Sequence, residues 1–228
     1  MGAPLVRYCL NKTDQGIALS LPAHVKWRPY RIDFQQGTLR YRYVHLQGRN
    51  ELIAKAVGWK RGCTLHVFDT TAGLGREAFL LAALGCDVTM FERHPVIATL
   101  LKDGLERASL DPKIAPIIER MQLNETCAIT YLKNAAPTIL PDVIYCDPMF
   151  PIKTKSAQVK KEMQMLQAVV GVDPDTVQLV EMALKSAKKR VVVKRAHTDP
   201  PLQEGPSFSL NARSHRFDVY LKSSLVNK

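Results

Sequence analysis

At 228 residues the chain is long enough for one α/β domain with a modest extension, and its hydrophobic fraction of 46% is ordinary for a globular protein. Its charge is less ordinary, because 32 Lys and Arg residues against 21 Asp and Glu residues give a formal net charge of +11. Such an excess indicates a polyanionic partner such as a nucleic acid. The longest apolar run, Ala78–Leu84, is much too short to cross a bilayer, which excludes a membrane-spanning helix.

The cysteines and histidines exclude two further classes of protein. The five cysteines form no CxxC pair, and the N-terminus has no charged-then-apolar leader, which argues against a secreted disulfide framework. The six histidines lack the spacing of metal ligands. We therefore expect a cytosolic, cytoplasmic protein with reduced thiols, with no bound metal and no membrane partner.

The N-terminal part of the chain differs in pattern from the rest. Tyr30–Phe34 and Leu39–Val44 alternate apolar and polar residues on either side of Gln35–Thr38, which predicts a β-hairpin with one basic face. Asn50 can cap a short helix that follows. We interpret residues 1–60 as a small N-terminal α+β extension that carries this basic hairpin.

Residues 61–228 show the alternation of strands and helices that is typical of a parallel sheet. The predicted parallel strands are Leu65–Phe68, Val88–Phe91, Met121–Leu123, Val143–Cys146 and Arg190–Lys194. The predicted helices are Arg76–Leu84, Pro95–Ala108, Lys160–Val170 and Pro174–Ala187. An antiparallel pair, Phe208–Leu210 and Arg216–Leu221, is predicted to close the sheet. We therefore expect an α/β domain with a mostly parallel twisted sheet and helices on both faces.

A glycine turn, Asp69-Thr70-Thr71-Ala72-Gly73-Leu74-Gly75, follows the first of these strands. Gly73 and Gly75 let the backbone approach a ligand that a side chain would exclude. Glu92 ends the next strand, where it can accept hydrogen bonds from ribose hydroxyls. Asp69 suits a cationic group such as an ammonium and would repel a pyrophosphate. These residues together predict a binding site for S-adenosylmethionine.

The same turn permits a second interpretation. Gly73–Ala78 matches the G-x-G-x-x-G/A fingerprint of dinucleotide-binding proteins, with Glu92 near the expected distance. An NAD(P)-dependent oxidoreductase is therefore an alternative, which Asp69 disfavours. A non-catalytic RNA-binding module built on a methyltransferase fold is another.

A second acidic turn, Asp147-Pro148-Met149-Phe150, follows the predicted buried strand Val143–Cys146. If Asp147 and the Pro148 carbonyl accept both hydrogens of an exocyclic amine, the nitrogen lone pair can be aimed at a methyl donor. Phe150 can stack on the base that carries this amine. We interpret these three residues as the catalytic residues of a methyl transfer to an amine such as that of guanine.

Three segments are rich in basic residues. Residues 22–49 hold six basic residues against one acid, Ile152–Lys161 holds four lysines and no acid, and Lys185–Arg195 holds six basic residues and no acid. Because the second segment directly follows the predicted catalytic turn, we expect RNA contacts around this site. The residues predicted to make them are Lys153, Lys155, Lys160, Lys161, Lys194 and Arg195.

Six segments of the chain together resemble one known family. They are DTTAGLGREAF (Asp69–Phe79), FERHP (Phe91–Pro95), YCDPMFP (Tyr145–Pro151), KSAQVKKEM (Lys155–Met163), RVVVKR (Arg190–Arg195) and HRFDVY (His215–Tyr220). In this order and combination, over roughly residues 50–220, they resemble the ribosomal RNA small subunit methyltransferase J family.

The resemblance implies a Rossmann-like class I methyltransferase fold and S-adenosylmethionine as the cofactor. It also implies methyl transfer to the N2 amine of one guanine near the 3′ end of bacterial 16S ribosomal RNA, so that the partner is ribosomal RNA or the small ribosomal subunit. Carried over by motif, the implied cofactor pocket comprises Arg76, Glu77, Glu92, Arg93, Cys127, Ala128 and Asp147.

Overall fold

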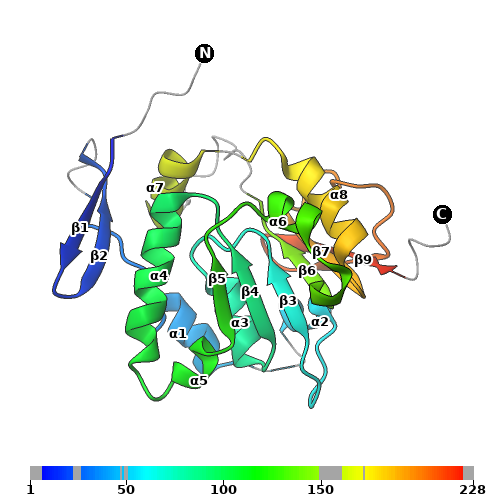
Figure 1. Cartoon of the computed structure of the whole chain (residues 1–228), viewed down its shortest axis with the longest axis horizontal. Helices are drawn as coiled ribbons and strands as arrows, with labels where there is room; N and C mark the ends of the chain where they lie inside the picture. Colours follow the sequence, from blue (N-terminus) through cyan, green and yellow to red (C-terminus); the bar gives the residue numbers. More distant parts are fainter. Residues whose placement is uncertain are drawn as a thin grey trace.

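The computed structural model describes residues 7–22, 27–46, 48, 51–148, 161–171 and 173–222. Within this part of the chain, seven strands form one sheet with the order β5-β4-β3-β6-β7-β9-β8. These strands are β3 (His66–Asp69), β4 (Asp87–Phe91), β5 (Met121–Asn124), β6 (Val143–Cys146), β7 (Arg190–Arg195), β8 (Phe208–Asn211) and β9 (Arg216–Leu221). Strands β3 to β7 are parallel, and β9 runs antiparallel to both β7 and β8 (Figure 1). The predicted α/β sheet is therefore confirmed.

Helices cover both faces of this sheet. Six helices contribute to the core cluster on one face. They are α1 (Gly37–Val44, through Leu39), α2 (Leu52–Val57, through Ile53), α3 (Arg76–Ala83), α4 (Pro95–Ser109), α5 (Ala115–Ile118) and α7 (Lys161–Val170). Residues of α6 (Ala128–Asn134) and α8 (Thr176–Ser186) form the second cluster with the opposite face. A short 3-10 helix, Pro137–Ile139, precedes β6.

Strand β6 shows why its sequence is apolar throughout. Val143 and Tyr145 belong to the first core cluster, whereas Ile144 and Cys146 belong to the second. Successive side chains of a strand point to opposite faces, so a strand covered on both faces needs apolar residues at every position. The strand thus carries the Asp147 turn on a fully buried support.

The hairpin predicted over Tyr30–Val44 is wrong, because α1 occupies Gly37–Val44. The alternation of apolar and basic residues there resembles a strand, but the helix buries Leu39 and packs Tyr43 edge-on against Phe79 at 5.7 Å between ring centroids. These two residues of α1 are four positions apart and so share one helix face.

The hairpin of the N-terminal region lies earlier in the chain. Its strands are β1 (Cys9–Thr13) and β2 (Gly16–Ser20). Leu19 of β2 exchanges backbone hydrogen bonds of 2.8 Å with Tyr30 and is fully buried. Leu19, together with Ile32 and other residues of the first sixty, belongs to the core cluster that also contains residues of β3 and α3. A separate unit that ends at residue 60 stays a prediction.

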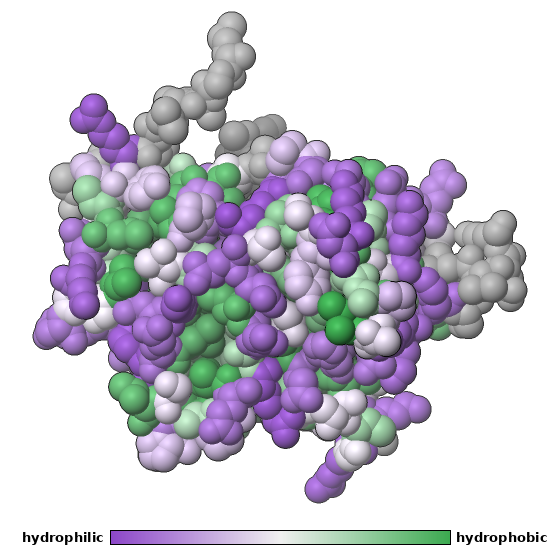
Figure 2. All heavy atoms as spheres, in the orientation of Figure 1, coloured by the Kyte–Doolittle hydropathy of each residue, from purple (hydrophilic) through white to green (hydrophobic). Residues whose placement is uncertain are grey.

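The surface is mixed in character. Hydrophilic side chains are spread over the whole face seen in Figure 2, with apolar side chains between them. Among the described residues, none of the helices combines the length and the hydropathy that crossing a membrane requires.

Replacing Gly75 with alanine is expected to destabilise the fold. Gly75 has a φ of +69°, and a Cβ there would lie 2.8 Å from Leu101 Cδ1 and 3.2 Å from Phe34 Cζ. Backbone strain and overpacking should together lower the free energy of unfolding by about 2–4 kcal/mol in a urea titration. Gly85→Ala is the matched control, because Gly85 also has a positive φ (+94°) but open space around its Cβ position. Equal losses in the two variants would contradict the role of close packing at Gly75.

Candidate active site

The carboxyl ends of β3, β4, β5 and β6 meet at one edge of the sheet. The chain enters the sheet at β3 and builds outwards first through β4 and β5, and then through β6 and β7 on the other side. A strand order that reverses in this way leaves a crevice at the carboxyl edge, where ligands of open α/β sheets bind.

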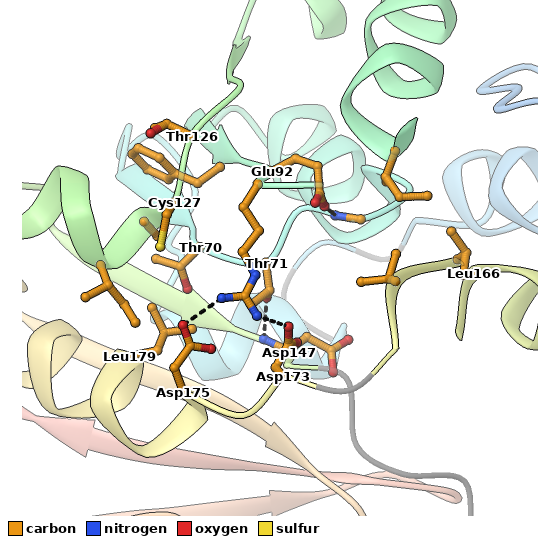
Figure 3. A pocket seen from close by; sticks show the side chains of 17 residues that line it. Thr70, Thr71, Glu92, Thr126, Cys127, Asp147, Leu166, Asp173, Asp175 and Leu179 are labelled. Atoms are coloured by element: carbon orange, nitrogen blue, oxygen red, sulfur yellow. Dashed lines mark hydrogen bonds and ion pairs between the residues drawn. The ribbon is translucent and has the colours of Figure 1, made fainter. Parts of the chain in front are cut away.

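A pocket occupies this crevice. Its lining residues come from the turns after all four strands, from α4, α6, α7 and α8, and from the segment between α7 and α8 (Figure 3). Apolar walls are supplied by Phe91, Ile97, Ile129, Leu166, Val170 and Leu179, and polar groups by Thr70, Thr71, Glu92, Arg93, Thr126, Asp147, Asp173 and Asp175, with Gly73, Cys127 and Ala128 completing the lining. Four acidic residues and one basic residue line the described pocket, so its charge favours a cationic ligand.

Glu92 is held in place by two backbone groups. Its Oε2 accepts the N–H of Gly73 at 3.0 Å, and its Oε1 accepts the N–H of His94 at 2.7 Å. Burial raises the pKa of this carboxyl, while both hydrogen bonds act in the opposite direction. The carboxylate therefore has a fixed orientation at the pocket wall, in the position predicted for the ribose contact.

The two predicted glycines have different surroundings. Gly73 lines the pocket, and a Cβ at this position would meet only the carbonyl of Thr71, at 3.8 Å. Gly75 instead faces Leu101 and Phe34 in the core and precedes α3 as its N-cap. The structure thus places Gly73 at the pocket and gives Gly75 a packing role.

Asp69 lies beneath the glycine turn, outside the pocket lining. It is only 2% exposed, and its Oδ1 accepts the N–H of Thr71 at 3.2 Å. Burial raises the pKa of Asp69 to about 8, and the carboxyls of Glu77, Asp147 and Glu92 act in the same direction.

Two threonines that sequence patterns did not single out join the turn after β3 to the turn after β6. The N–H of Asp147 donates to Thr71 Oγ1 at 2.7 Å, a contact drawn in Figure 3. The Thr70 N–H and hydroxyl both donate to the carbonyl of Tyr145, at 3.0 and 2.9 Å. The Thr-Thr pair inside the glycine turn was the available signal, because short hydroxyl side chains bond readily to nearby backbone.

Asp147 faces a lysine of the neighbouring strand. Lys194 Nζ lies 2.6 Å from Asp147 Oδ2 and 3.6 Å from Glu77 Oε1. Burial raises the pKa of Asp147 and Lys194 opposes this shift. Burial alone would lower the pKa of Lys194, but the two carboxylates outweigh it and hold that pKa above its usual value.

The two basic residues of β7 predicted to contact RNA are therefore placed differently. Lys194 is engaged by two carboxylates, with its side chain 23% exposed. Arg195 is buried, and its Nε and Nη2 donate to the carbonyl of Pro200 at 3.0 and 2.7 Å. Neither the ammonium nor the guanidinium stands on an open face, so the structure does not favour a phosphate contact for either residue.

Arg93 lines the pocket and binds two aspartates that are distant in the sequence. Its guanidinium bonds to Asp173, and to Asp175 Oδ2 at 2.6 Å, which ties the end of β4 to the segment before α8. The hydrogen bond to Asp175 raises the pKa of Arg93 above its usual value. The sequence indicates the arginine but neither of its partners, because nothing local marks a pairing over about eighty residues.

The remaining predicted residues are scattered around this centre. Cys127 and Ala128 line the pocket at the start of α6, as the resemblance implies. Arg76 lines a separate hollow beside Tyr30 and Asp33, and it is not among the residues that line the pocket at the carboxyl edge of the sheet. Pro148 is buried next to Asp147. Phe150, Lys153, Lys155 and Lys160 lie outside the described residues, as does the side chain of Lys161, whose backbone begins α7. No group of three or more potential metal ligands occurs among the residues that the structure describes.

Asp69→Asn should change how stability depends on pH. The folded protein holds the Asp69 proton up to about pH 8, whereas an unperturbed carboxyl loses it near 3.8. Because the folded state binds more protons between these values, the contribution of Asp69 to the free energy of unfolding falls as pH rises, by at most about 1.4 kcal/mol per unit. Urea titrations at several pH values should show the wild type losing stability relative to Asp69→Asn over this interval. Parallel curves for both proteins would contradict the shifted pKa.

Comparison with known proteins identifies the chain's relatives. It is 53% identical over 199 residues to a protein of Dechloromonas aromatica named "Ribosomal RNA small subunit methyltransferase J", a match that covers 86% of this chain and 80% of the relative. A protein of Colwellia psychrerythraea with the same name is 45% identical over 223 residues, 97% of this chain and 81% of that one.

A solved structure and a family model agree with these relatives. The SAM-dependent methyltransferase NGO1261 of Neisseria gonorrhoeae superimposes with a TM-score of 0.75 and 35% identity, covering 97% of this chain and 85% of that one. The family model described as "Putative SAM-dependent methyltransferase" matches residues 3–222. S-adenosylmethionine is thus the cofactor, and the nicotinamide alternative is not supported. The chain belongs to this family of SAM-dependent methyltransferases, together with the relatives named ribosomal RNA small subunit methyltransferase J.

Proposed function

We propose that this enzyme transfers the methyl group of S-adenosylmethionine to the exocyclic N2 amine of a guanine in bacterial 16S ribosomal RNA. The observation that carries the proposal is the position of Asp147, which directly follows the buried strand β6, lines the pocket and donates its backbone N–H to Thr71. The names of the relatives and the net charge of +11 support ribosomal RNA as the substrate. A ribosomal substrate places the enzyme in the cytoplasm.

The described pocket fits S-adenosylmethionine. The Glu92 carboxylate, oriented by two backbone N–H groups, can accept hydrogen bonds from ribose hydroxyls. Ile129 and Leu179 offer apolar surface for the adenine ring, and the excess of acidic side chains matches a cationic cofactor. When bound, this cofactor supplies an electrophilic methyl group on a sulfonium.

Asp147 performs two tasks in the proposed reaction. Its carboxylate and the carbonyl of Pro148 accept the N–H hydrogens of the guanine amine, so that the nitrogen lone pair turns towards the methyl group. Once the nitrogen has bonded to the methyl carbon and the bond from that carbon to sulfur has broken, which would leave S-adenosylhomocysteine, the nitrogen carries one proton too many, and Asp147 accepts this proton. Burial makes the carboxylate more basic than an exposed one, which suits it to this second task. Phe150, outside the described residues, is the proposed stacking partner of the base.

Lys194 acts through Asp147 in this proposal. An ammonium 2.6 Å from the carboxylate favours its ionised form and fixes its orientation. Without this cation, the partly buried carboxyls of Asp147 and Glu77 would have no positive charge between them. Lys194 is therefore a positioning residue.

The function is tested by tritium transfer from labelled S-adenosylmethionine to unmodified small-subunit ribosomal RNA and to whole small subunits, followed by nucleoside analysis. Label is expected in N2-methylguanosine. Asp147→Ala should lower the rate by about 100-fold or more, since it removes the acceptor for the amine hydrogens. Label in another nucleoside would overturn the target atom, and an undiminished rate in Asp147→Ala would overturn the role of this carboxylate. Any transfer to RNA would exclude the alternative of a non-catalytic RNA-binding module.

Lys194→Met is expected to reduce the maximal rate roughly tenfold near neutral pH, which corresponds to about 1.4 kcal/mol. Removing the cation raises the pKa of Asp147 further, so activity should be lost at a higher pH than in the wild type as the solution is acidified. Lys194→Arg, which keeps the charge, should restore the wild-type pH profile in large part. A raised KM for RNA in Lys194→Met, with an unshifted pH profile, would contradict this role, because that behaviour is expected when a phosphate contact is lost.

A further inference from the structure

Helix α1 presents an unusual set of side chains to solvent. Tyr41 and Val44 are each 65% exposed, and Arg40 is exposed beside them. The ring of Tyr41 packs on that of His45 at 4.2 Å between centroids, which holds the exposed tyrosine in one place. The helix contains no acidic residue. An ordered aromatic ring between arginines is the combination that single-stranded nucleic acids bind, through stacking and phosphate neutralisation.

This helix is connected to the proposed catalytic carboxylate by a chain of ion pairs. Arg42 Nη1 lies 3.9 Å from Glu77 Oε1, and the same oxygen lies 3.6 Å from Lys194 Nζ. Lys194 in turn contacts Asp147 at 2.6 Å. Arg42, Glu77 and Lys194 are absent from the cofactor pocket lining, so α1 approaches Asp147 from outside that pocket.

The turn between β8 and β9 is a second basic element, next to the Lys194 end of β7. The Ala212 N–H donates to the carbonyl of His215 at 2.8 Å, which leaves Arg213 exposed at the tip. Residues 205–217 contain no acid. His215 packs edge-on against Phe217 at 5.0 Å, and Phe217 is paired with Lys194 in the sheet register. The turn therefore lies at the sheet edge that carries Asp147, and α1 reaches the same lysine through Arg42 and Glu77.

We propose that α1 and the β8–β9 turn form the surface that holds a single-stranded segment of the substrate RNA next to the target guanine. This proposal rests on the function proposed above and assigns it an RNA-contact surface on the described chain. Tyr41 would stack on an unpaired base, and Arg40, Arg42 and Arg213 would contact phosphates. A single strand fits better than a duplex, because the bases of a duplex are already stacked and cannot cover an exposed ring.

The test uses the full-length protein and a transcript of unmodified small-subunit ribosomal RNA, with binding measured at several salt concentrations. Tyr41→Ala should raise the Kd for RNA roughly tenfold, in the range expected when one base no longer stacks on an aromatic ring. The double variant Arg40→Gln/Arg42→Gln should weaken binding and reduce the slope of log K against log salt by about 0.7 for each phosphate that is no longer neutralised. Binding of S-adenosylhomocysteine and thermal unfolding of each variant verify that the fold and the pocket are kept.

The matched control is Lys133→Gln/Lys185→Gln. It removes the same charge from exposed positions on α6 and α8, which cover the sheet face opposite to α1. Its Kd for RNA and its salt slope should change much less than those of the α1 variants. Equal effects of the two double variants would show a general effect of net charge and overturn the proposed surface.

The outcomes separate this inference from the proposed function. Wild-type protein that methylates RNA, with α1 variants that bind and react as the wild type does, overturns the surface and leaves the function standing. RNA binding that depends on α1 without methyl transfer to any ribosomal RNA supports the surface and overturns the function. The RNA surface is overturned if the wild-type protein does not bind the transcript. It is also overturned if the α1 variants bind the transcript normally but lose binding to an acidic protein.

Discussion

The site depends on one junction, where the turn after β3 is bonded to the turn after β6. Thr71 accepts the N–H of Asp147, and Thr70 bonds twice to the carbonyl of Tyr145. One turn carries Gly73, proposed to approach the cofactor, and the other carries Asp147, the proposed hydrogen-bond acceptor, so these bonds fix the distance between the two halves of the proposed site. Methyl transfer requires near-linear alignment over a few ångströms, and a loose junction would lose most of the benefit of positioning. Both threonines act through short side chains whose reach leaves little freedom.

The sheet register explains why a lysine can serve Asp147. Strands β6 and β7 are parallel, and Cys146 is paired with Val193, so the next residues on the two strands, Asp147 and Lys194, come side by side. Their contact is therefore built into the backbone and does not depend on a flexible loop. Burial penalises charge on both groups, but each offsets the penalty on the other. Replacing only one of them leaves an uncompensated charge, which makes the pair more sensitive to mutation than an exposed ion pair.

Features of the fold and the site could be predicted from sequence where the interactions behind them are local in the chain, and not where they join distant residues. The sheet was predictable because each of its strands carries its own signal, such as the apolar run of β6 and the turn that ends β3. The helix α1 was not, because Leu39 and Tyr43 match a strand alternation as well as a helix face, and only packing against Phe79 decides between them. Local charge alone predicts an RNA contact for Lys194, since its carboxylate partner lies 47 residues away. The pairing of Arg93 with Asp173, 80 residues away, could not be predicted for the same reason.

The distribution of charge gives the proposed function a physical rationale. The chain as a whole is strongly basic, yet four of the five charged residues that line its described pocket are acids, so it combines a field that attracts a cationic cofactor with one that attracts a polyanion. Such fields would cancel if they were mixed at one place. Here the Asp147–Lys194 pair stands between them, with the carboxylate at the pocket and the ammonium towards Glu77 and α1. In the proposed reaction, a base drawn in by the basic side would meet the Asp147 carboxylate at the boundary between the two regions, so that the Asp147–Lys194 pair would order both reactants.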